Sequence, residues 1–401
     1  MKKHRVLIVP GFVADTYSEI ESSYVELTAN PDNDIDYIWM VPSIGAKHNR
    51  FKNPDNARAL AEPLYVAHLR ERQIPFVEGS LSKYNPIANL LVFQRIFRAT
   101  GVCAVYTHFG FERFWATFFG KLFGKTTIWN EHWYSMGTKF VGLKRVFYKC
   151  FVDYFIAVSK YVAKTLPVGS KVFTVLNAIE AQPNKEVGQG RRRELRSALG
   201  LPAEGVIVLM VAAFRPEKRH SMALSICRTI LQSHPSVTFV FLGDGPLRAP
   251  FVADVDRLGL SDRIRAPGHV TNIDEYHLAA DLCMLTSSTE AFGYCVAEAM
   301  KYARPMVTFA SGGPCEIIRN GETGILVQEG DIDGFVGHLR KLIDDSTYRA
   351  TLGNNANKSI VRDFSRLRWT LQMQQVMDQI CREDLEQGRS HARRAQSHGI
   401  R

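Results

Sequence analysis

The sequence predicts an α/β protein built from two Rossmann-like domains, and three observations carry this prediction. Short apolar runs alternate with longer helical patterns over nearly the whole chain, as is typical of parallel sheets packed between helices. A polar stretch at 181–190 has the composition of a linker and separates two such series. The length of 401 residues suits two or three domains, at roughly 100–200 residues each.

The first series contains seven expected strands, and the second contains six. The first seven are expected at 5–9, 36–40, 75–78, 103–108, 126–132, 154–159 and 171–177. The other six are expected at 206–214, 237–243, 264–268, 282–287, 305–310 and 324–327. Helical patterns lie between them, for example at 55–73 and 87–98.

These elements predict an N-terminal domain over 1–180 and a C-terminal domain over 181–366. A closing helix is expected over 367–386, followed by a basic, disordered tail over 387–401. Two such domains form a cleft between the carboxyl edges of their sheets, which is where α/β proteins bind ligands.

Composition excludes several classes of protein. Charged residues make up 22% and aromatic residues 11%, which is ordinary for a globular chain and excludes a disordered or fibrous one. No apolar run reaches the ~18–20 residues that span a bilayer, and the first residues do not resemble a signal peptide. Seven cysteines without any C-x-x-C spacing indicate reduced thiols, so we expect a cytoplasmic protein.

The net charge of +10 is unevenly distributed. Residues 113–171 contain ten Lys or Arg residues and only two acids, interleaved with Phe and Trp. Such a stretch favours contact with an anionic surface, either a membrane or a nucleic acid. The alternative is a solvated basic face that only aids solubility.

The most informative motif is Ser287-Ser-Thr-Glu290-Ala-Phe-Gly293-Tyr-Cys-Val-Ala-Glu298, which follows a buried strand and opens a helix near Gly293. Glycine allows close approach of a ligand to the backbone, and the first N–H groups of a helix bind anions. Glu298 lies about 7.5 Å further along that helix, roughly the distance from a diphosphate to the ribose of one nucleotide. The alternative is a solvated loop carboxylate and an ordinary helical one.

Further motifs accompany this stretch in a characteristic order. They are Ile156-Ala-Val-Ser159, Asn177-Ala-Ile-Glu180, Val211-Ala-Ala-Phe-Arg215-Pro-Glu-Lys218, Gly243-Asp-Gly-Pro-Leu-Arg248, Gly268-His-Val270 and Ser311-Gly-Gly-Pro-Cys-Glu316. The set resembles the retaining glycosyltransferases of family 4, which have the GT-B fold of two Rossmann-like domains facing across a cleft. The resemblance is close over 150–363 and holds in outline over 1–150.

The resemblance implies a donor site in the C-terminal domain. Glu290 corresponds to the glutamate that holds hydroxyls of the donor sugar, and Glu298 to the one that holds the ribose. Lys218 corresponds to the lysine that neutralises the diphosphate. The backbone turn at the diphosphate corresponds to Phe292, Gly293 and Tyr294. Taken alone, Lys218 would be an ordinary surface lysine.

The resemblance also implies an acceptor side in the N-terminal domain. His132, in Trp129-Asn-Glu-His132, resembles the histidine that reaches the sugar from this side. His108 and Gly11 are expected to line the acceptor pocket. Both histidines would otherwise be hydrogen-bonded residues at strand ends, and Glu316 is expected to be structural.

The sequence departs from the family pattern in three places. Ala213 stands where the family has an arginine, the N-terminal loop 10–15 has the single glycine Gly11, and the NGID-like turn reads Asn177-Ala-Ile-Glu180. Residues two apart on a strand face the same way, so we expect Arg215 to replace the arginine missing at Ala213. The alternative is that Arg215 pairs with Glu217 or points to solvent.

We expect the chemistry to need no metal and no cofactor. Departure of a nucleoside diphosphate builds negative charge, which Lys218, Arg215 and the helix N-terminus at Gly293 can stabilise. The Asp-x-Asp pairs at 34/36, 254/256 and 331/333 are expected to be helix caps or solvated residues. Retention requires no pair of carboxylates at the spacing that hydrolases use.

The sequence therefore predicts a glycosyltransferase that moves a sugar from a nucleotide sugar to a glycan or lipid-linked acceptor in surface polysaccharide or envelope glycan synthesis. We expect peripheral contact with the cytoplasmic membrane through 113–171 and no nucleic-acid partner. A sugar-nucleotide epimerase of the same two-domain shape is the main alternative. A dehydrogenase is disfavoured, because Gly243-x-Gly245 lacks the third glycine of a dinucleotide fingerprint. The base, sugar, acceptor and linkage are not determined by the sequence.

Overall fold

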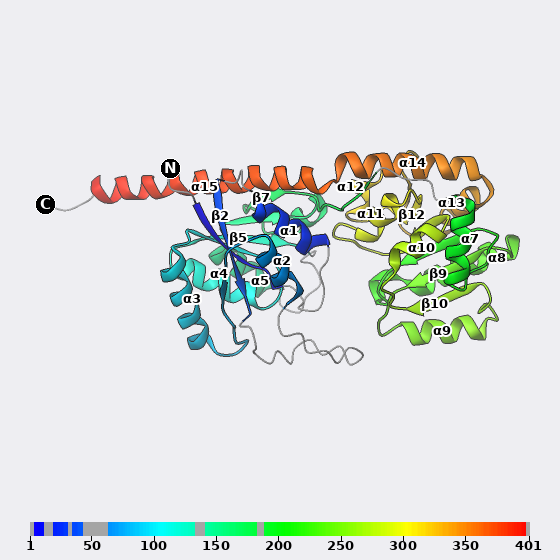
Figure 1. The fold of residues 1–401 in the computed structure, drawn as a ribbon, viewed down its shortest axis with the longest axis horizontal. Coiled ribbons are helices and arrows are strands. Elements are labelled where there is room, and N and C mark those ends of the chain that lie inside the picture. Colours follow the sequence, from blue (N-terminus) through cyan, green and yellow to red (C-terminus); the bar gives the residue numbers. More distant parts are fainter. Residues whose placement is uncertain are drawn as a thin grey trace. The chain divides into compact units, whose positions relative to one another are not determined.

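The computed structural model describes residues 4–11, 19–30, 34–42, 63–132, 141–182 and 188–397. The chain forms two units, of which unit 1 comprises 1–178 and 366–401, and unit 2 comprises 179–365. Each unit has its own parallel sheet with helices on both faces, which confirms the predicted pair of Rossmann-like domains (Figure 1).

Unit 1 contains a seven-stranded parallel sheet in the order β3-β2-β1-β4-β5-β6-β7. Its strands are β1 His4–Val9, β2 Ile35–Val41, β3 Phe76–Glu78, β4 Ala104–Thr107, β5 Thr126–Glu131, β6 Tyr154–Ala157 and β7 Lys171–Thr174. All seven lie where the sequence predicted them. The central strands are buried along their whole length, as expected for a sheet covered on both faces.

The helices of unit 1 cover both faces of this sheet. They are α1 Glu19–Ala29, α2 Leu64–Glu71, α3 Pro86–Thr100, α4 Glu112–Leu122, α5 Val141–Phe151, α6 Lys160–Ala163 and α15 Arg366–Ser397. One core lies under α1, α2 and α15, and a second lies under α3 and α4. Helix α3 has a regular start, because the Asn85 side chain accepts a hydrogen bond from the backbone N–H of Ala88 (3.0 Å) and Pro86 follows it.

Helix α15 belongs to unit 1, although unit 2 separates it from the rest of that unit in the sequence. Trp369, Met373, Met377 and Ile380 are buried in the core under α1 and α2, and Figure 1 shows α15 (orange to red) running beside the sheet. The spacing of four, four and three residues places them on one face of the helix. The expected closing helix over 367–386 is therefore part of this longer helix.

Residues 387–397, expected to be disordered, continue α15 as a helix. Arg, Ala and Gln make up most of this segment, and all three have high helix propensity. Extending a helix that is already anchored requires no new nucleus, so these residues continue it at little cost. The positive charge of this segment therefore does not prevent it from being helical.

Unit 2 contains a six-stranded parallel sheet in the order β10-β9-β8-β11-β12-β13. Its strands are β8 Ile207–Val211, β9 Thr238–Leu242, β10 Ile264–Gly268, β11 Leu282–Leu285, β12 Met306–Phe309 and β13 Ile325–Val327. Each lies within a predicted segment. Strand β8, however, ends three residues before the expected position, so Arg215 lies outside the strand.

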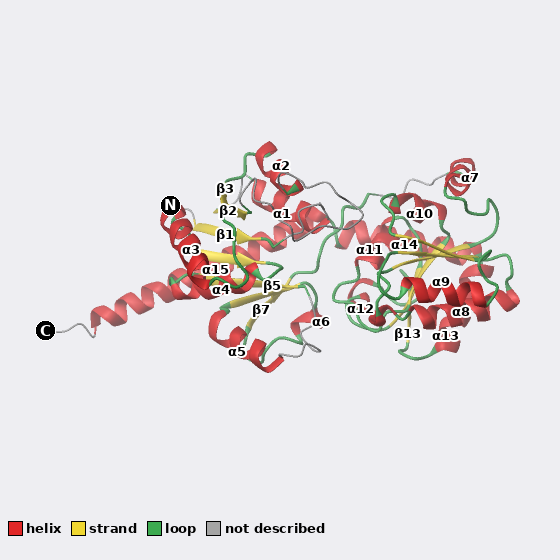
Figure 2. Cartoon of the chain, turned by 90° about the horizontal axis from the view of Figure 1, so that it is seen from below, coloured by secondary structure: helices red, strands yellow, loops and turns green. Residues whose placement is uncertain are grey.

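The helices of unit 2 form two layers. They are α7 Gln189–Ala198, the short 3-10 helix η2 Pro216–Lys218, α8 His220–Ser233, α9 Arg248–Arg257, α10 Ile273–Ala279, α11 Tyr294–Lys301, α12 Pro314–Ile317, α13 Ile332–Asp344 and α14 Ser346–Asp363. Figure 2 shows α10 and α14 on one side of the sheet, with α8, α9 and α13 on the other. Strands β8 and β11 are neighbours, so the loops that follow them meet at the carboxyl edge of the sheet.

Candidate active site

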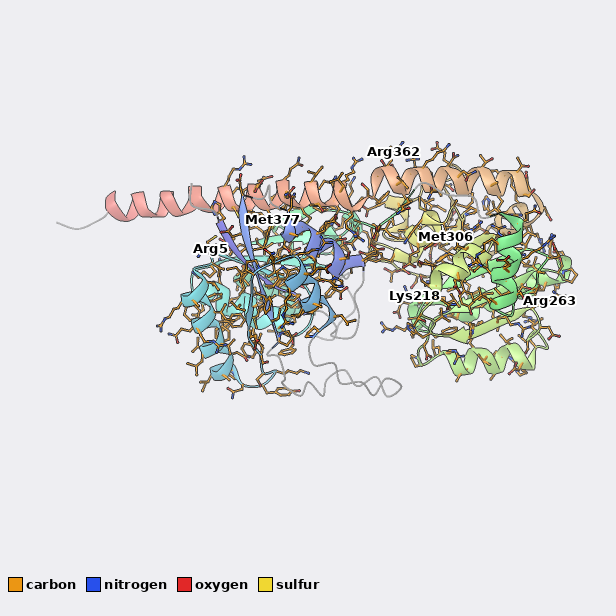
Figure 3. All side chains as sticks on the ribbon, viewed as in Figure 1. Arg5, Lys218, Arg263, Met306, Arg362 and Met377 are labelled. Carbon is orange, nitrogen blue, oxygen red and sulfur yellow. The ribbon has the colours of Figure 1, made fainter. Side chains whose placement is uncertain are left out.

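Lys218 lies at the carboxyl edge of the unit 2 sheet, in the short helix η2 that follows β8. Figure 3 labels it at the end of the unit opposite to Arg263, which precedes strand β10. The loop after β11 holds η2 in place. Thr286 Oγ1 donates a hydrogen bond to the carbonyl oxygen of Lys218 (2.8 Å), and the backbone N–H of Ser288 donates to that of Glu217 (2.8 Å). The backbone of Lys218 is therefore fixed to the residues that precede Glu290.

Lys218 and Glu290 form an ion pair, with 2.5 Å between Nζ and Oε1. Their side chains are 18% and 12% exposed, so both are mostly shielded from water. Burial opposes the charge on Lys218, but the carboxylate of Glu290 outweighs it and the pKa of Lys218 lies above its ordinary value. Lys218 is therefore a cation at neutral pH. The structure brings together two residues that the sequence separates by 72 positions.

Two glycines allow the turn at Glu290 to adopt its position. A Cβ atom on Gly312 would lie 2.2 Å from the carbonyl oxygen of Glu290, and one on Gly313 would lie 2.3 Å from that of Phe292. The backbone N–H of Gly313 also donates to the carbonyl oxygen of Glu290 (2.8 Å). In the sequence this glycine pair was only part of one of the motifs that carry the family resemblance. The structure shows that it supports the backbone of the proposed donor site.

Helix α11 begins directly after this turn. Gly293 precedes it with φ 100° and ψ 60°, a left-handed conformation that only glycine adopts readily. Phe292 is buried, and its ring centroid lies 5.2 Å from that of Tyr294. Glu298 follows on the same helix and is half-buried. The order predicted from the sequence, a glycine turn, a helix N-terminus and then a carboxylate, is present.

Arg215 does not lie on a strand, so the expectation that it shares a strand face with Ala213 was wrong. Strand β8 ends at Val211, and the backbone N–H of Phe214 then pairs with the carbonyl oxygen of Asp244 (3.0 Å). Arg215 keeps the extended backbone expected before Pro216, with φ −125° and ψ 159°. Its side chain is exposed and forms no ion pair with the residues that the structure describes, Glu217 included.

The Gly243-x-Gly245 motif has a structural explanation. A Cβ atom on Gly243 would lie 2.2 Å from the carbonyl oxygen of Ala212, and one on Gly245 would lie 2.6 Å from that of Phe214. Both glycines are needed because the loops after β8 and β9 approach each other closely. The resemblance to a dinucleotide-binding motif therefore reflects packing of the protein backbone against itself.

In unit 1 the structure brings His108, His132 and Gly11 together. His108 follows β4 and His132 follows β5, and these strands are neighbours. His108 Nδ1 lies 3.2 Å from His132 Nε2. A Cβ atom on Gly11 would lie 2.1 Å from the carbonyl oxygen of Phe109, so only glycine allows this approach of the two loops. These three residues form one cluster at the carboxyl edge of the sheet.

Both histidines are neutral near pH 7. Burial, together with the nearby His132 and Arg113, lowers the pKa of His108 well below its ordinary value. Burial and Arg113 lower the pKa of His132 to about 3. The rings can therefore donate or accept hydrogen bonds, but they carry no charge.

The role of Glu131 was not predicted from the sequence, where it is one of only two acids in the basic stretch 113–171. Glu131 is fully buried at the end of β5. Its carboxylate lies 3.6 Å from Arg113 Nη1 and 3.7 Å from Lys144 Nζ, and Tyr148 donates a hydrogen bond to it (2.5 Å). The surrounding apolar strand residues were the available signal, because a buried carboxylate requires partners.

Fewer basic and aromatic side chains of the stretch 113–171 are available at the surface than its composition suggested. Trp115, Phe118, Phe119 and Phe123 pack against the core under α3 and α4. Arg113 and Lys144 contact Glu131, whereas Lys121 and Lys171 pair with Asp153 and Glu383. Lys139, which the sequence suggested as part of a basic surface, lies outside the described residues. The exposed large apolar residues among the described part of this stretch are Phe114 (37%), Leu122 (63%), Leu143 (70%), Val146 (58%) and Val168 (97%).

The described residues contain no group of three or more His, Cys, Asp or Glu side chains that could hold a metal ion. Asp331, from one of the Asp-x-Asp pairs, caps α13 by accepting a hydrogen bond from the backbone N–H of Gly334 (2.8 Å). Within the same part of the chain, the helices are too short or too polar to cross a bilayer.

Comparison with protein families finds a match over the segment that carries the Lys218–Glu290 ion pair. Residues 191–359 match the family of glycosyl transferases group 1. This group 1 segment contains Lys218, Glu290, Gly293 and Glu298, together with the supporting Gly312 and Gly313.

Curated relatives match the chain over a similar region. The chain is 29% identical over 172 residues to the lipopolysaccharide core biosynthesis glycosyltransferase LpsE of Rhizobium meliloti (strain 1021), covering 43% of this chain and 49% of LpsE. It is 26% identical over 191 residues to N-acetyl-alpha-D-glucosaminyl L-malate synthase of Bacillus anthracis, covering 48% of this chain and 50% of the synthase. The aligned part spans about half the length of these relatives.

Solved structures extend the similarity to nearly the whole fold. The crystal structure of HepE from Anabaena in complex with UDP and glucose matches with a TM-score of 0.73 and 18% identity. The match covers 93% of this chain and 99% of HepE. The chain therefore has the GT-B fold that the resemblance to glycosyltransferases implied.

Proposed function

We propose that the protein is a retaining glycosyltransferase that transfers a sugar from a nucleotide-sugar donor to a glycan or lipid-linked acceptor. The observation that carries this proposal is the Lys218–Glu290 ion pair beside the N-terminus of α11, within the group 1 segment. The relatives support a role in surface polysaccharide or envelope glycan synthesis, because one is named for lipopolysaccharide core biosynthesis. The comparisons give no support to the epimerase alternative.

The donor side would work through fixed charge. Cleavage of the bond between the anomeric carbon and the phosphate oxygen leaves the bonding electrons on the diphosphate, and Lys218 is a nearby cation that burial has not neutralised. The N-terminus of α11 adds oriented backbone dipoles at the same place. Glu290 would hold sugar hydroxyls and Glu298 the ribose, while Arg215, exposed at the edge of the loop, would reach the diphosphate when donor binds.

The acceptor side would lie in unit 1, at His132, His108 and Gly11. His132 is neutral, so it can contact a sugar hydroxyl by hydrogen bonding without competing for the diphosphate. Retention follows if the acceptor hydroxyl attacks from the face that the phosphate leaves, and the departing phosphate can take its proton. Binding both substrates in one protein supplies the entropic part of the rate.

We further propose that the protein is cytoplasmic and docks peripherally on an anionic membrane. The residues that support this differ in part from those the sequence suggested, because the apolar contribution comes from α5 and not from the aromatic residues of α4. Leu143 and Val146 of α5 are exposed apolar side chains, and Arg145 and Lys149 of the same helix are exposed bases. A base near an anionic leaflet contributes about 1 kcal/mol, so this α5 surface combines two membrane-binding features.

Vesicle co-sedimentation tests the docking. The wild-type protein should sediment with vesicles that contain phosphatidylglycerol, less so with neutral phosphatidylcholine vesicles, and the double variant Leu143→Asp/Val146→Asp should lose this binding. A matched control is Leu367→Asp, because Leu367 is also exposed but lies on α15. Equal binding of the wild type to both kinds of vesicle would contradict the proposal.

A donor screen tests the proposed activity. A ligand that binds only the folded protein raises its melting temperature, so UDP-glucose, UDP-N-acetylglucosamine, GDP-mannose and ADP-glucose can be compared directly. We expect one nucleotide class to raise the melting temperature of the wild type and to have a smaller effect on Lys218→Ala. A transferase would release nucleoside diphosphate in an acceptor-dependent manner, whereas an epimerase would alter the sugar nucleotide without acceptor.

A further inference from the structure

The two histidine rings of unit 1 contact each other through specific nitrogens. His108 Nδ1 and His132 Nε2 are 3.2 Å apart, and the ring centroids are 5.4 Å apart. His108 is completely buried, and His132 is 7% exposed. A contact at this distance is a hydrogen bond only if one ring donates and the other accepts. This pairing occupies Nε2 of His132 and does not use its Nδ1.

The surroundings of His108 fix its ring and its backbone. The ring of Tyr24 packs edge-on against it with centroids 4.0 Å apart, and Tyr106 packs in the same manner at 4.9 Å. The backbone N–H of His108 donates to Val9 on the neighbouring strand (3.2 Å), and Arg113 Nη1 donates to the carbonyl oxygen of His108 (3.1 Å). His108 therefore occupies a single, well-supported position.

Arg113 also connects His108 to the strand that carries His132. Its Nη1 lies 3.6 Å from the carboxylate of Glu131, the residue directly before His132. Its guanidinium group lies over the ring of Trp129, 4.4 Å from the centroid. One mostly buried cation thus contacts the chain at the ends of both β4 and β5, which restrains the two rings from moving apart.

The tautomers of two neutral rings in hydrogen-bond contact are linked, because one ring must donate and the other must accept. Burial keeps both rings uncharged near pH 7, so each carries one proton on one nitrogen. If Nδ1 of His108 donates, His132 accepts at Nε2 and carries its single proton on Nδ1; if Nε2 of His132 donates, its Nδ1 carries no proton. An isolated imidazole would instead exchange between its two tautomers.

We propose that His108 is a positioning residue for His132. The hydrogen bond between the two rings fixes the tautomer and the orientation of His132, and leaves Nδ1 as the nitrogen that His132 presents to substrate. The role of His132 in the reaction rests on the proposed function, whereas the ring pair does not. The competing explanation is that the two histidines only fill the core.

Three variants separate these explanations. His108→Leu keeps the bulk and removes the hydrogen bond, whereas His108→Asn places an amide near the position of Nδ1 and can restore it. Tyr24→Phe is the matched control in the same core. It keeps the ring edge against His108 and removes a hydroxyl that contacts Tyr106 (2.6 Å) and Asn130 (2.5 Å).

NMR of the protein labelled with ¹⁵N-histidine reads the tautomer of His132 without any ligand. We expect His132 to show one fixed tautomer with a hydrogen-bonded Nε2 in the wild type and in the His108→Asn and Tyr24→Phe variants. In His108→Leu its ring nitrogens should shift to the averaged values of a tautomer mixture. If His108→Leu does not fold, His108→Gln replaces it, because its longer amide falls near Nε2 of the original ring. Unchanged His132 resonances in the variant that lacks the Nδ1 contact would overturn the proposal.

Turnover of UDP-glucose as the probe donor tests the effect on the reaction. Since misplacement of a reacting group by about 1 Å can cost about 10²-fold, His108→Leu should lower kcat by about that factor and change the KM for UDP-glucose less. His108→Asn should recover most of the loss, and Tyr24→Phe should stay close to wild type. Equal impairment of the Leu and Asn variants would show that His108 only fills space. Absence of turnover by the wild type with every donor would count against the proposed function. The NMR measurement would still show whether His108 fixes the tautomer of His132.

Discussion

The carboxyl edges of the two sheets are built in opposite ways. Unit 2 presents a charged pair, Lys218 and Glu290, whose lysine remains a cation although it is mostly buried. Unit 1 presents two buried histidines that remain neutral, while its charged residues Arg113 and Glu131 contact each other beside the ends of β4 and β5. The difference suggests a division of work, in which one edge stabilises developing charge and the other places hydrogen-bonding groups.

The largest expected effect concerns Lys218, at the carboxyl edge of the unit 2 sheet. Lys218→Ala should lower kcat by about 10²–10³, as the loss of one preorganised donor to a developing anion typically does. Steady-state kinetics with the donor found in the screen measures this. Lys341→Ala is the control, because Lys341 lies on α13 and contacts Tyr348 outside the cluster. A near-wild-type kcat in Lys218→Ala would show that the charge of Lys218 does not stabilise the departing diphosphate.

The second effect separates the two carboxylates of this edge. Glu290→Gln keeps the shape of the side chain and removes its charge, so it should mainly lower kcat. Glu298→Ala removes a proposed ribose contact and should mainly raise the KM for the donor. If both variants change only the donor KM, Glu290 is a binding residue and its proposed role in turnover is wrong.

The third effect tests the neutral edge through pH. Below about pH 6.5 the unfolded chain takes up a proton at His132, whereas the folded chain does not do so until about pH 3. The free energy of unfolding should therefore fall with decreasing pH in that window, by up to about 1.4 kcal/mol per pH unit for this histidine. Urea titrations at pH 7, 6 and 5 should show a shallower fall for His132→Gln than for the wild type. Substitution of the exposed His269 is the control, and an equal fall in His132→Gln would show that His132 is not held neutral.

The smallest effect concerns Arg215. Its side chain is exposed, so binding must order it before it can contact a diphosphate, and exposed ion pairs contribute about 0.2–1 kcal/mol. Arg215→Ala should therefore lower kcat by less than tenfold, well below the effect of Lys218→Ala. Adding Ala213→Arg should recover part of that loss. A loss as large as that of Lys218→Ala would show that Arg215 becomes buried when donor binds.

The strands could be predicted because fully buried parallel strands appear as continuous apolar runs. The end of β8 could not be predicted, because Phe214 is apolar and buried like a strand residue but lies in a loop, where it packs against His220 and Phe251. Periodicity alone does not distinguish an apolar strand residue from an apolar loop residue. Similarly, the aromatic residues of α4 suggested a surface by composition, although Phe119 stacks on Trp115 in the core.

The candidate site could be predicted only through the family resemblance. The sequence alone places Lys218 and Glu290 in separate loops, and nothing in their spacing shows that β8 and β11 are neighbours. Glu131 was overlooked because its partners Arg113, Lys144 and Tyr148 come from two different helices. Contacts of this kind follow from the strand order, which the residue pattern does not contain.

The return of α15 to unit 1 has a consequence for biosynthesis. Unit 1 needs Trp369, Met373 and Met377 to complete its core, but the ribosome makes all of 179–365 before it makes them. At about 5–20 residues per second, the apolar face under α15 stays open for roughly 10–40 s after the rest of unit 1 has emerged. Unit 2 can fold in that interval, whereas unit 1 cannot finish. The nascent chain should therefore recruit a holding chaperone until translation ends, and a separately supplied α15 peptide should shield that face in trans.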